Sequence, residues 1–379
     1  VADAGLRRVW VSTNAGSSFS ELTGGAALTA AINDLSISSL DGSKRYIGVA
    51  GAAAAAEFWY FDLGSSVPAW VDAVSAATWA GFLPATADSM MAIAFSPYFT
   101  SDLTAVAVST DSTTNLMEFH ILSFNQKKWD TAAGFAGYRF AIYSGVGVIA
   151  VAKVAISLDP AYLGGDDSLR VAFVAASIAD AGTVAAADGG IWRLKDTSVK
   201  QLLTNVDMWS IAWNGANLVA GPMDSNAVRR SADAMSTDPT ISSASSLKRP
   251  GLSGIGNNTV VAWAGSNVVA GVADGAATGF NSSFAISTDN GATFKETALV
   301  DTAWDVVVDF WVAADGSAVW VMTNDSVTNA GDSSLWKKEG SDWGRVWVMA
   351  GTGAAGYIVR GAKDNKDVLY IADADVLGA

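Results

Sequence analysis

Three aspartates that lie close together in the sequence carry the ligand type that calcium prefers. Asp159, Asp166 and Asp167 flank the backbone carbonyls of Leu163-Gly164-Gly165. Ca²⁺ binds clustered carboxylate and carbonyl oxygens. The spacing is not that of an EF-hand, and an ordinary solvated turn accounts for the same residues. A weak calcium site is therefore one hypothesis and a plain turn is the other, and the sequence predicts no further cofactor.

The chain has a single histidine, His120, between Phe119 and Ile121 in a stretch with strand character. A lone histidine inside a strand is typical of a structural role, and the residue inventory argues against a Ser-His-Asp triad or a histidine metal centre. Only five of the 37 acidic residues are Glu. Hydrolysis of a glycosidic bond needs two carboxylates about 5 to 10 Å apart with separated pKa values, and the 32 Asp leave such a pair possible without identifying it. We assign no catalytic residue.

The charge balance excludes one class of partner. Lys and Arg number 23 against 37 Asp and Glu, which gives a formal charge of −14. No basic cluster exceeds two residues, whereas nucleic-acid binding needs a basic face, so we expect no nucleic-acid partner. No apolar run reaches the roughly 20 residues that span a bilayer, so we expect no transmembrane segment. The chain has no Cys and no visible signal peptide and starts at Val1, so we expect a processed or excised form.

Strands and tight turns, rather than helices, must position these side chains. Asp favours turns and Glu favours helices, so the excess of Asp indicates turns. Ala212–Gly221 matches Ala262–Gly271 at seven of ten positions, and each copy has the pattern of strand, short turn and strand. The same pattern recurs around five further turns: Asp41–Ser43, Pro97–Leu103, Asp159–Ser168, Asp315–Ser317 and Asp364–Asp367. Repeats of about 50 residues are typical of propeller blades.

A turn of distinctive composition, ISTDNGATF, covers Ile286–Phe294. It resembles the Asp-box (BNR repeat), S-x-D-x-G-x-T-[FW], of β-propellers such as sialidases, xyloglucanases and sortilin-type receptors. In such a turn an Asp accepts hydrogen bonds from the backbone and Gly supplies a positive φ. The resemblance assigns structural roles to Ser287, Asp289, Gly291, Thr293 and Phe294, to an Asn-containing variant at Ser12, Asn14, Gly16 and Phe19, and to a decayed copy at Ser231 and Asp233.

Together these patterns predict an all-β fold, a seven-bladed β-propeller of four-stranded antiparallel blades in one domain, 1–379. The last blade is closed by N- and C-terminal strands, because the chain ends after the seventh turn with two strands missing. A closed ring also leaves no exposed sheet edge at the closure. The expected blades are approximately 24–80, 81–140, 141–204, 205–250, 251–300, 301–350, and 351–379 together with 1–23.

The preferred functional interpretation is a non-enzymatic interaction or scaffold propeller, extracellular or on a prokaryotic cell surface, with the periplasm as the alternative location. We expect a protein or glycan partner and allow a homo-oligomer or a larger, even filamentous, assembly. The alternative is a carbohydrate-active enzyme, a glycoside hydrolase or lyase, that uses Asp carboxylates at the central-channel face. A third interpretation, an assembly factor similar to the photosystem propellers, requires a basic patch that the sequence lacks. Converging carboxylates beside exposed aromatic rings would favour the enzyme.

Overall fold

The structure is a computed structural model that describes residues 7–25, 28–29, 31–42, 44–82, 86–183, 187–223, 225–244, 247, 258–272, 283–297, 306–325, 332–340, 342–349 and 356–374. Its strands form seven antiparallel sheets, which confirms the predicted seven-bladed β-propeller. Within these ranges the helical segments are α1 (Phe99–Asp102) and the 3₁₀ turn η1 (Asp167–Leu169), and neither is long enough to cross a membrane.

The chain divides into two compact units, a three-sheet unit formed by Leu22–Val206 and a four-sheet unit formed by Val1–Glu21 with Asp207–Asp375. The assignment of all blades to one domain stays a prediction.

The three-sheet unit follows the chain order closely, because three of every four connections are hairpins between adjacent strands. Its first sheet is β3 (Ala31–Ile37), β4 (Tyr46–Ala52), β5 (Ala56–Asp62) and β6 (Trp70–Asp72). The second is β7 (Ser89–Phe95), β8 (Thr104–Asp111), β9 (Leu116–Ser123) and β10 (Lys128–Trp129), with β11 (Phe140–Ser144) also paired to β9. The third is β12 (Ile149–Leu158), β13 (Val171–Asp180), β14 (Gly190–Lys195) and β15 (Ser198–Thr204).

The four-sheet unit contains the repeated segments and the chain closure. Its sheets are β16 (Met208–Trp213), β17 (Leu218–Pro222), β18 (Arg229–Ser231) and β19 (Ser242–Ser243); β20 (Thr259–Ala264), β21 (Asn267–Val272), β22 (Ser283–Ser287) and β23 (Lys295–Thr297); and β24 (Val306–Val312), β25 (Val319–Asp325), β26 (Asp332–Glu339) and β27 (Asp342–Met349). The last sheet combines β28 (Gly356–Ala362) and β29 (Asn365–Ala374) with β1 (Val9–Ser12) and β2 (Ser20–Glu21).

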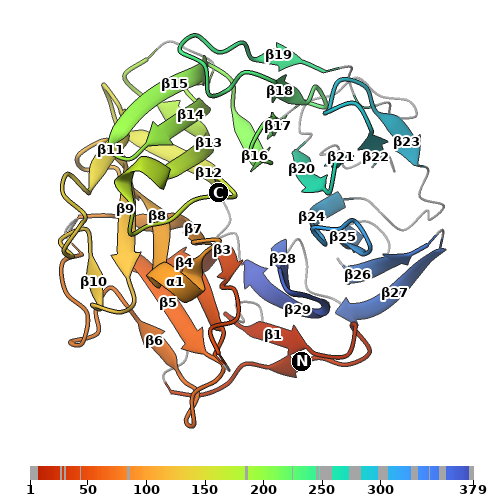
Figure 1. Cartoon of the computed structure of the whole chain (residues 1–379), viewed down its shortest axis with the longest axis horizontal. Helices are drawn as coiled ribbons and strands as arrows, with labels where there is room; N and C mark the ends of the chain where they lie inside the picture. Colours follow the sequence, from red (N-terminus) through yellow and green to blue (C-terminus); the bar gives the residue numbers. More distant parts are fainter. Residues whose placement is uncertain are drawn as a thin grey trace. The chain divides into compact units, whose positions relative to one another are not determined.

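The N-terminal strand completes the last sheet. Val9 is opposite Ala372 and Ser12 is opposite Leu369, so β1 pairs with β29 in an antiparallel ladder. Figure 1 shows the red β1 beside the blue β29. The predicted closure by N- and C-terminal strands is therefore confirmed. It also gives β29 a partner on each side, which removes an exposed edge.

Small residues inside the strands let the sheets approach one another. β4 is rich in Gly and Ala, and five of its seven residues are buried. A Cβ on Gly48 would lie 3.0 Å from the ring atoms of Phe58 and of Phe95. Phe95 belongs to the next sheet of the three-sheet unit, so the missing side chain of Gly48 makes room for a ring between the sheets. In an interior packed this closely, the addition of even one methyl group destabilises the fold.

Three first strands carry a polar side chain that caps the backbone of the next sheet. Asp34 Oδ2 accepts the Ile93 N–H at 3.1 Å, and Ser210 Oγ accepts the Val261 N–H at 3.0 Å. Asp309 repeats the arrangement toward β28. In all three strands the capping residue directly follows a β-bulge. Bulges re-aim side chains, and an edge strand exposes unpaired amides, so each cap satisfies a donor that the sheet itself leaves free.

Candidate functional site

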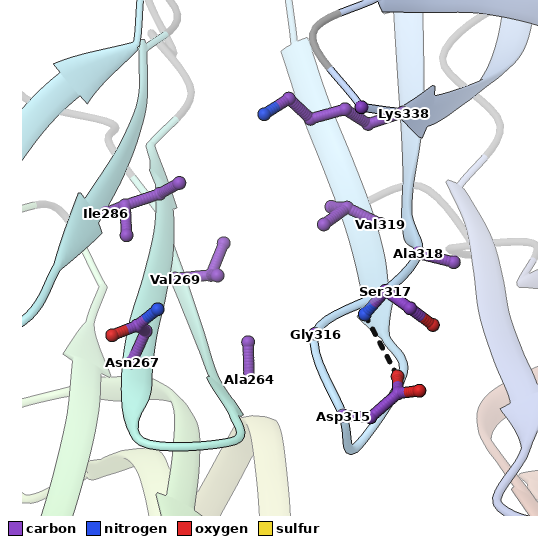
Figure 2. A pocket seen from close by; sticks show the side chains of 11 residues that line it. Ala264, Asn267, Val269, Ile286, Asp315, Gly316, Ser317, Ala318, Val319 and Lys338 are labelled. Carbon is purple, nitrogen blue, oxygen red and sulfur yellow. Dashed lines mark hydrogen bonds between the residues drawn. The ribbon is translucent and has the colours of Figure 1, made fainter.

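A pocket of about 360 Å³ lies between two neighbouring sheets of the four-sheet unit, β20–β23 and β24–β27 (Figure 2). Its walls are aliphatic: Ala264, Val269 and Ile286 stand on one side and Ala318 and Val319 on the other. Polar groups of Asn267, Asp315, Ser317 and Lys338 lie among them. The volume lies within the range of small-molecule sites, about 300–1,000 Å³, and the lining combines apolar and polar groups.

Two tight turns hold the pocket open at one end. The β20–β21 turn contains Gly265 at φ +58°, and the β24–β25 turn contains Gly316 at φ +72°. Both are values that glycine adopts without strain. The Gly265 N–H donates to the carbonyl of Ala314 at 2.8 Å, which ties one turn to the other across the two sheets. The pocket walls are therefore set by backbone contacts.

Lys338 is the cation of the pocket, and it has no ion-pair or hydrogen-bond partner within the part of the chain that the structure describes. The side-chain amide of Asn267 is equally free within those residues. Asp315 differs, because it accepts the Ser317 N–H at 2.9 Å. This hydrogen bond, with help from the nearby Lys366, holds the pKa of Asp315 below its usual range. Within the described residues the pocket thus offers an unpaired cation and an unpaired amide, whereas its carboxylate is hydrogen-bonded within its own turn.

The sequence identified the Asp315–Ser317 turn but gave no role to Lys338 or Asn267. One signal was present in the repeat. Asn214 stands where the second copy has Ala264, and Asn214 Oδ1 accepts the Ala216 and Asn217 amides at 3.0 and 2.7 Å. Ala264 has no such side chain, so the second copy lacks this cap and leaves space beside its turn.

A hydrogen-bonded Ser-His-Asp array lies inside the second sheet of the three-sheet unit. Ser109 Oγ is 2.8 Å from His120 Nε2, and Asp130 Oδ2 is 2.8 Å from His120 Nδ1. The inventory argument against such an array is thus corrected, since one histidine is enough to form it. The three residues are 1%, 0% and 5% exposed.

The array has no access to a substrate. The rings of Phe82 and Trp129 pack against the imidazole of His120, at centroid distances of 5.4 and 5.9 Å. A nucleophilic serine must reach a scissile carbonyl beside oxyanion donors, and Ser109 is closed off within its sheet. The geometry supports the structural role predicted for His120.

A second acidic site, at the end of β13, is fully occupied by donors. Asp180 accepts the amides of Val146, Gly147 and Gly182, each at 2.8 Å, and the hydroxyl of Tyr143 at 3.0 Å. Burial opposes ionisation here, but these donors outweigh it and hold the pKa of Asp180 below its usual range. The burial of Tyr143 and its bond to Asp180 raise its pKa to about 12. Asp180 fastens a loop and has no lone pair left for a substrate.

The pKa is also lowered for other carboxyl groups in the described chain. Hydrogen bonds from neighbouring amides and hydroxyls lower the pKa of every carboxyl group that shows a clear departure: Asp111, Asp166, Asp180, Asp233, Asp289 and Asp315. A glycosidase acid needs the opposite, a carboxyl group whose pKa is raised toward neutrality. No such proton donor is visible in these residues.

The three calcium candidates are placed in one loop but are engaged separately. Asp159 Oδ1 accepts the Ala161 N–H at 2.8 Å, and Asp166 Oδ1 accepts from Ser168 as the cap of η1, in which Asp167 lies. Among the residues that the structure describes, no three acidic or histidine side chains gather closely enough to hold a metal ion. Calcium binding at this loop stays a prediction.

The residues of the ISTDNGATF turn form a compact hydrogen-bonded unit. Ser287 Oγ donates to Asp289 Oδ1 at 2.7 Å and accepts the Gly291 N–H at 2.9 Å, and Asp289 Oδ1 accepts the Thr293 N–H at 2.8 Å. Donation from Thr293 and Ser287 lowers the pKa of Asp289. Phe294 packs against a cluster of core residues that includes Val219.

Both other predicted copies share the Ser-to-Asx hydrogen bond. Ser12 Oγ donates to Asn14 Oδ1 at 3.0 Å, and Ser231 Oγ donates to Asp233 Oδ1 at 2.8 Å. Gly16 is the counterpart of Gly291: its φ is +80°, and its N–H donates to Ser12 Oγ. Phe19 packs against Trp347 at a centroid distance of 6.3 Å. The three turns share the Ser-to-Asx hydrogen bond, and the turns of Ser12 and Ser287 also share the glycine; their membership of the Asp-box family stays a prediction.

No family model and no curated protein matches the sequence. Solved structures do resemble the chain. One is a protein from Lactobacillus plantarum (10% identity, TM-score 0.52, covering 92% of this chain and 97% of that one). Another is a protein from Bacteroides uniformis provisionally named a 6-phosphogluconolactonase (11%, 0.53, 91% and 97%). A study of two prolyl endopeptidases supplies a third (9%, 0.53, 90% and 46%), so this chain spans about half of that one. At these identities the likeness shows the fold alone.

Proposed function

We propose that the chain is a non-enzymatic interaction module, a single propeller domain with Asp-box turns, that holds a protein or glycan partner without transforming it. Its place is an extracellular or cell-surface assembly of a prokaryote, and the pocket between β20–β23 and β24–β27 is its recognition site. A cysteine-free, acidic chain suits an exported scaffold, and the rigid turns beside the pocket suit recognition by preformed groups.

One observation carries the proposal against the carbohydrate-active alternative. Six carboxyl groups among the described residues have a pKa below the ordinary value, because backbone amides and hydroxyls already bond to them. Hydrolysis of a glycosidic bond requires one protonated carboxyl group near neutral pH and a second one opposite it. The pocket contains one carboxylate, Asp315, among its described lining residues. Because no carboxyl group with a raised pKa is seen among the described residues, we propose binding of a partner and not acid–base hydrolysis.

A reducing-end assay on a panel of acidic, neutral and amino polysaccharides tests the proposal. Wild-type protein and the double variant Asp180→Asn/Asp188→Asn are expected to release no more reducing ends than a buffer blank. Asp180 and Asp188 are adjacent carboxylates near the end of β13, where Asp188 Oδ2 accepts the Asp180 N–H at 2.9 Å. Release of sugar ends by the wild type above the buffer blank would establish the enzyme instead, whatever the double variant does.

A further inference from the structure

We infer that the pocket between β20–β23 and β24–β27 binds a carboxylate carried on a short, branched aliphatic body. The inference rests on the proposed function, because it names the ligand chemistry of that recognition site. The pocket supplies three kinds of contact at once: an ammonium and an amide that have no partner among the described residues, and aliphatic walls.

One end of the pocket can hold an anion, because Lys338 lies there and the ionised carboxylate of Asp315 lies at the other end (Figure 2). Lys338 extends its ammonium group from the β26 side toward the opposite sheet, on the side where Ile286 lies (Figure 2). It has no partner among the described residues, and Asp315 is already bonded to Ser317. An unpaired cation beside low-dielectric walls attracts an anion more strongly than one in bulk water. A charge-assisted hydrogen bond to a carboxylate is the contact that Lys338 can make.

The walls select an aliphatic body. Val269, Ile286 and Val319 line the space, and no aromatic ring is among its described lining residues. Sugar rings and nucleobases are commonly held by stacking on aromatic faces, so of the two partners in the proposed function these walls favour a protein over a glycan. A branched chain of three or four carbons would contact valine and isoleucine side chains directly. A volume of about 360 Å³ is at the small end of the range for small-molecule sites and has room for a ligand of the size of an amino acid.

Asn267 fixes the orientation of the ligand. Its side chain lies on the wall opposite Lys338 and has both donor and acceptor capacity without a partner among the described residues (Figure 2). A ligand that meets Lys338 with its carboxylate can therefore meet Asn267 with an amide or a second polar group. The C-terminal residue of a peptide that ends in Val or Leu has this combination, and so does a free branched-chain acid.

A methyl-labelled sample makes the inference testable at the site itself. Ile286 lines the pocket, so its δ1 methyl resonance reports occupancy. The probes are 3-methylbutanoate, its uncharged isostere 3-methylbutanamide, and 3-methylbutylamine. We expect the acid to shift the Ile286 signal with an about millimolar dissociation constant, as befits so small a ligand, and the amide to bind at least about tenfold more weakly.

Variants separate the charge from the space. Lys338→Met keeps the aliphatic stem and should weaken the acid at least about tenfold, and Lys338→Glu should reverse the preference toward the amine. Ala264→Asn introduces the side chain that the first repeat carries at Asn214, and it should exclude the acid while the protein stays folded. Lys128→Met, at an exposed position of β10 in the three-sheet unit, is the matched control and should bind like wild type.

Three results would overturn the inference: equal affinity for the acid and the amide, unchanged binding by Lys338→Met, or an Ile286 methyl signal that does not move at saturating acid. A Gly-Gly-Val peptide with a free or amidated C-terminus distinguishes the sources. Tighter binding of the free peptide than of the acid indicates a peptide C-terminus, whereas binding of the acid alone indicates a small metabolite, and either supports the carboxylate chemistry. Polysaccharide cleavage would defeat the proposed function without changing these affinities, so the two failures are distinguishable.

Discussion

Replacement of Ser210 by alanine should destabilise the four-sheet unit by about 2–3 kcal/mol. Ser210 Oγ donates to the Thr259 carbonyl at 2.8 Å and accepts the Val261 N–H at 3.0 Å, so one hydroxyl bridges two sheets. The side chain is 8% exposed and Val261 is 5% exposed, which leaves little room for water to substitute. Each lost hydrogen bond costs about 0.5–1.5 kcal/mol net, and a buried donor left unpaired costs about 1–3 kcal/mol.

Ser333→Ala is the matched control. Ser333 lies in the same unit and is 0% exposed, but its hydroxyl has no hydrogen-bond partner in the part of the chain that the structure describes. Its removal should be neutral or should stabilise the protein by up to about 1 kcal/mol, since an unpaired polar group is costly to bury. Urea unfolding followed by tryptophan fluorescence measures both differences, and hydrogen exchange of the Val261 amide locates the effect. If Ser210→Ala loses no more stability than Ser333→Ala, the caps between sheets do not stabilise this fold.

Three further changes test other parts of the structure. Hydrogen bonds lower the pKa of Asp289, so its carboxylate contributes stability that is complete above the unfolded-state pKa of about 4 and is lost as the pH falls. Urea unfolding of wild type and Asp289→Asn from about pH 6 to pH 2 should show a difference in unfolding free energy that shrinks toward pH 2. A difference that stays constant would contradict this. Gly48→Ala should cost about 1–3 kcal/mol in thermal or urea unfolding through contact with two phenylalanine rings, and an unchanged midpoint would show that the sheets can move apart. His120→Leu should cost about 3 kcal/mol or more in the same assay because it strands the buried carboxylate of Asp130, and a loss of hydrolytic activity in place of stability would reveal a catalytic array.

The sequence predicted the fold because the fold repeats. The matching copies at Ala212–Gly221 and Ala262–Gly271 became the hairpins β16–β17 and β20–β21, and the missing strands of the last blade were correctly sought at the N-terminus. Alternation and turn composition are local properties, so they can be read from neighbouring residues. The serine and Asx residues of the three predicted turns do meet, for the same reason.

The site could not be predicted in this way, because its parts meet only in three dimensions. Lys338 and Asn267 are separated by more than one blade in sequence, and neither stands in a distinctive motif. Ser109, His120 and Asp130 come together because β8, β9 and the segment after β10 are adjacent in one sheet. The number of histidines in the sequence does not show that these three residues are adjacent. The bulges that aim Asp34, Ser210 and Asp309 at the next sheet also could not be predicted, because a bulge interrupts the two-residue alternation from which strands are predicted.

Native mass spectrometry of the chain with a mixed pool of oligosaccharides and short peptides tests the central claim, binding without turnover, most directly. One spectrum records both which ligands are bound and whether their masses have changed after long incubation. The account predicts complexes whose bound ligands keep their intact masses, with carboxylate-terminated aliphatic peptides enriched and lost again in Lys338→Met. Ligand masses reduced to hydrolysis or elimination products in the presence of the protein would contradict it.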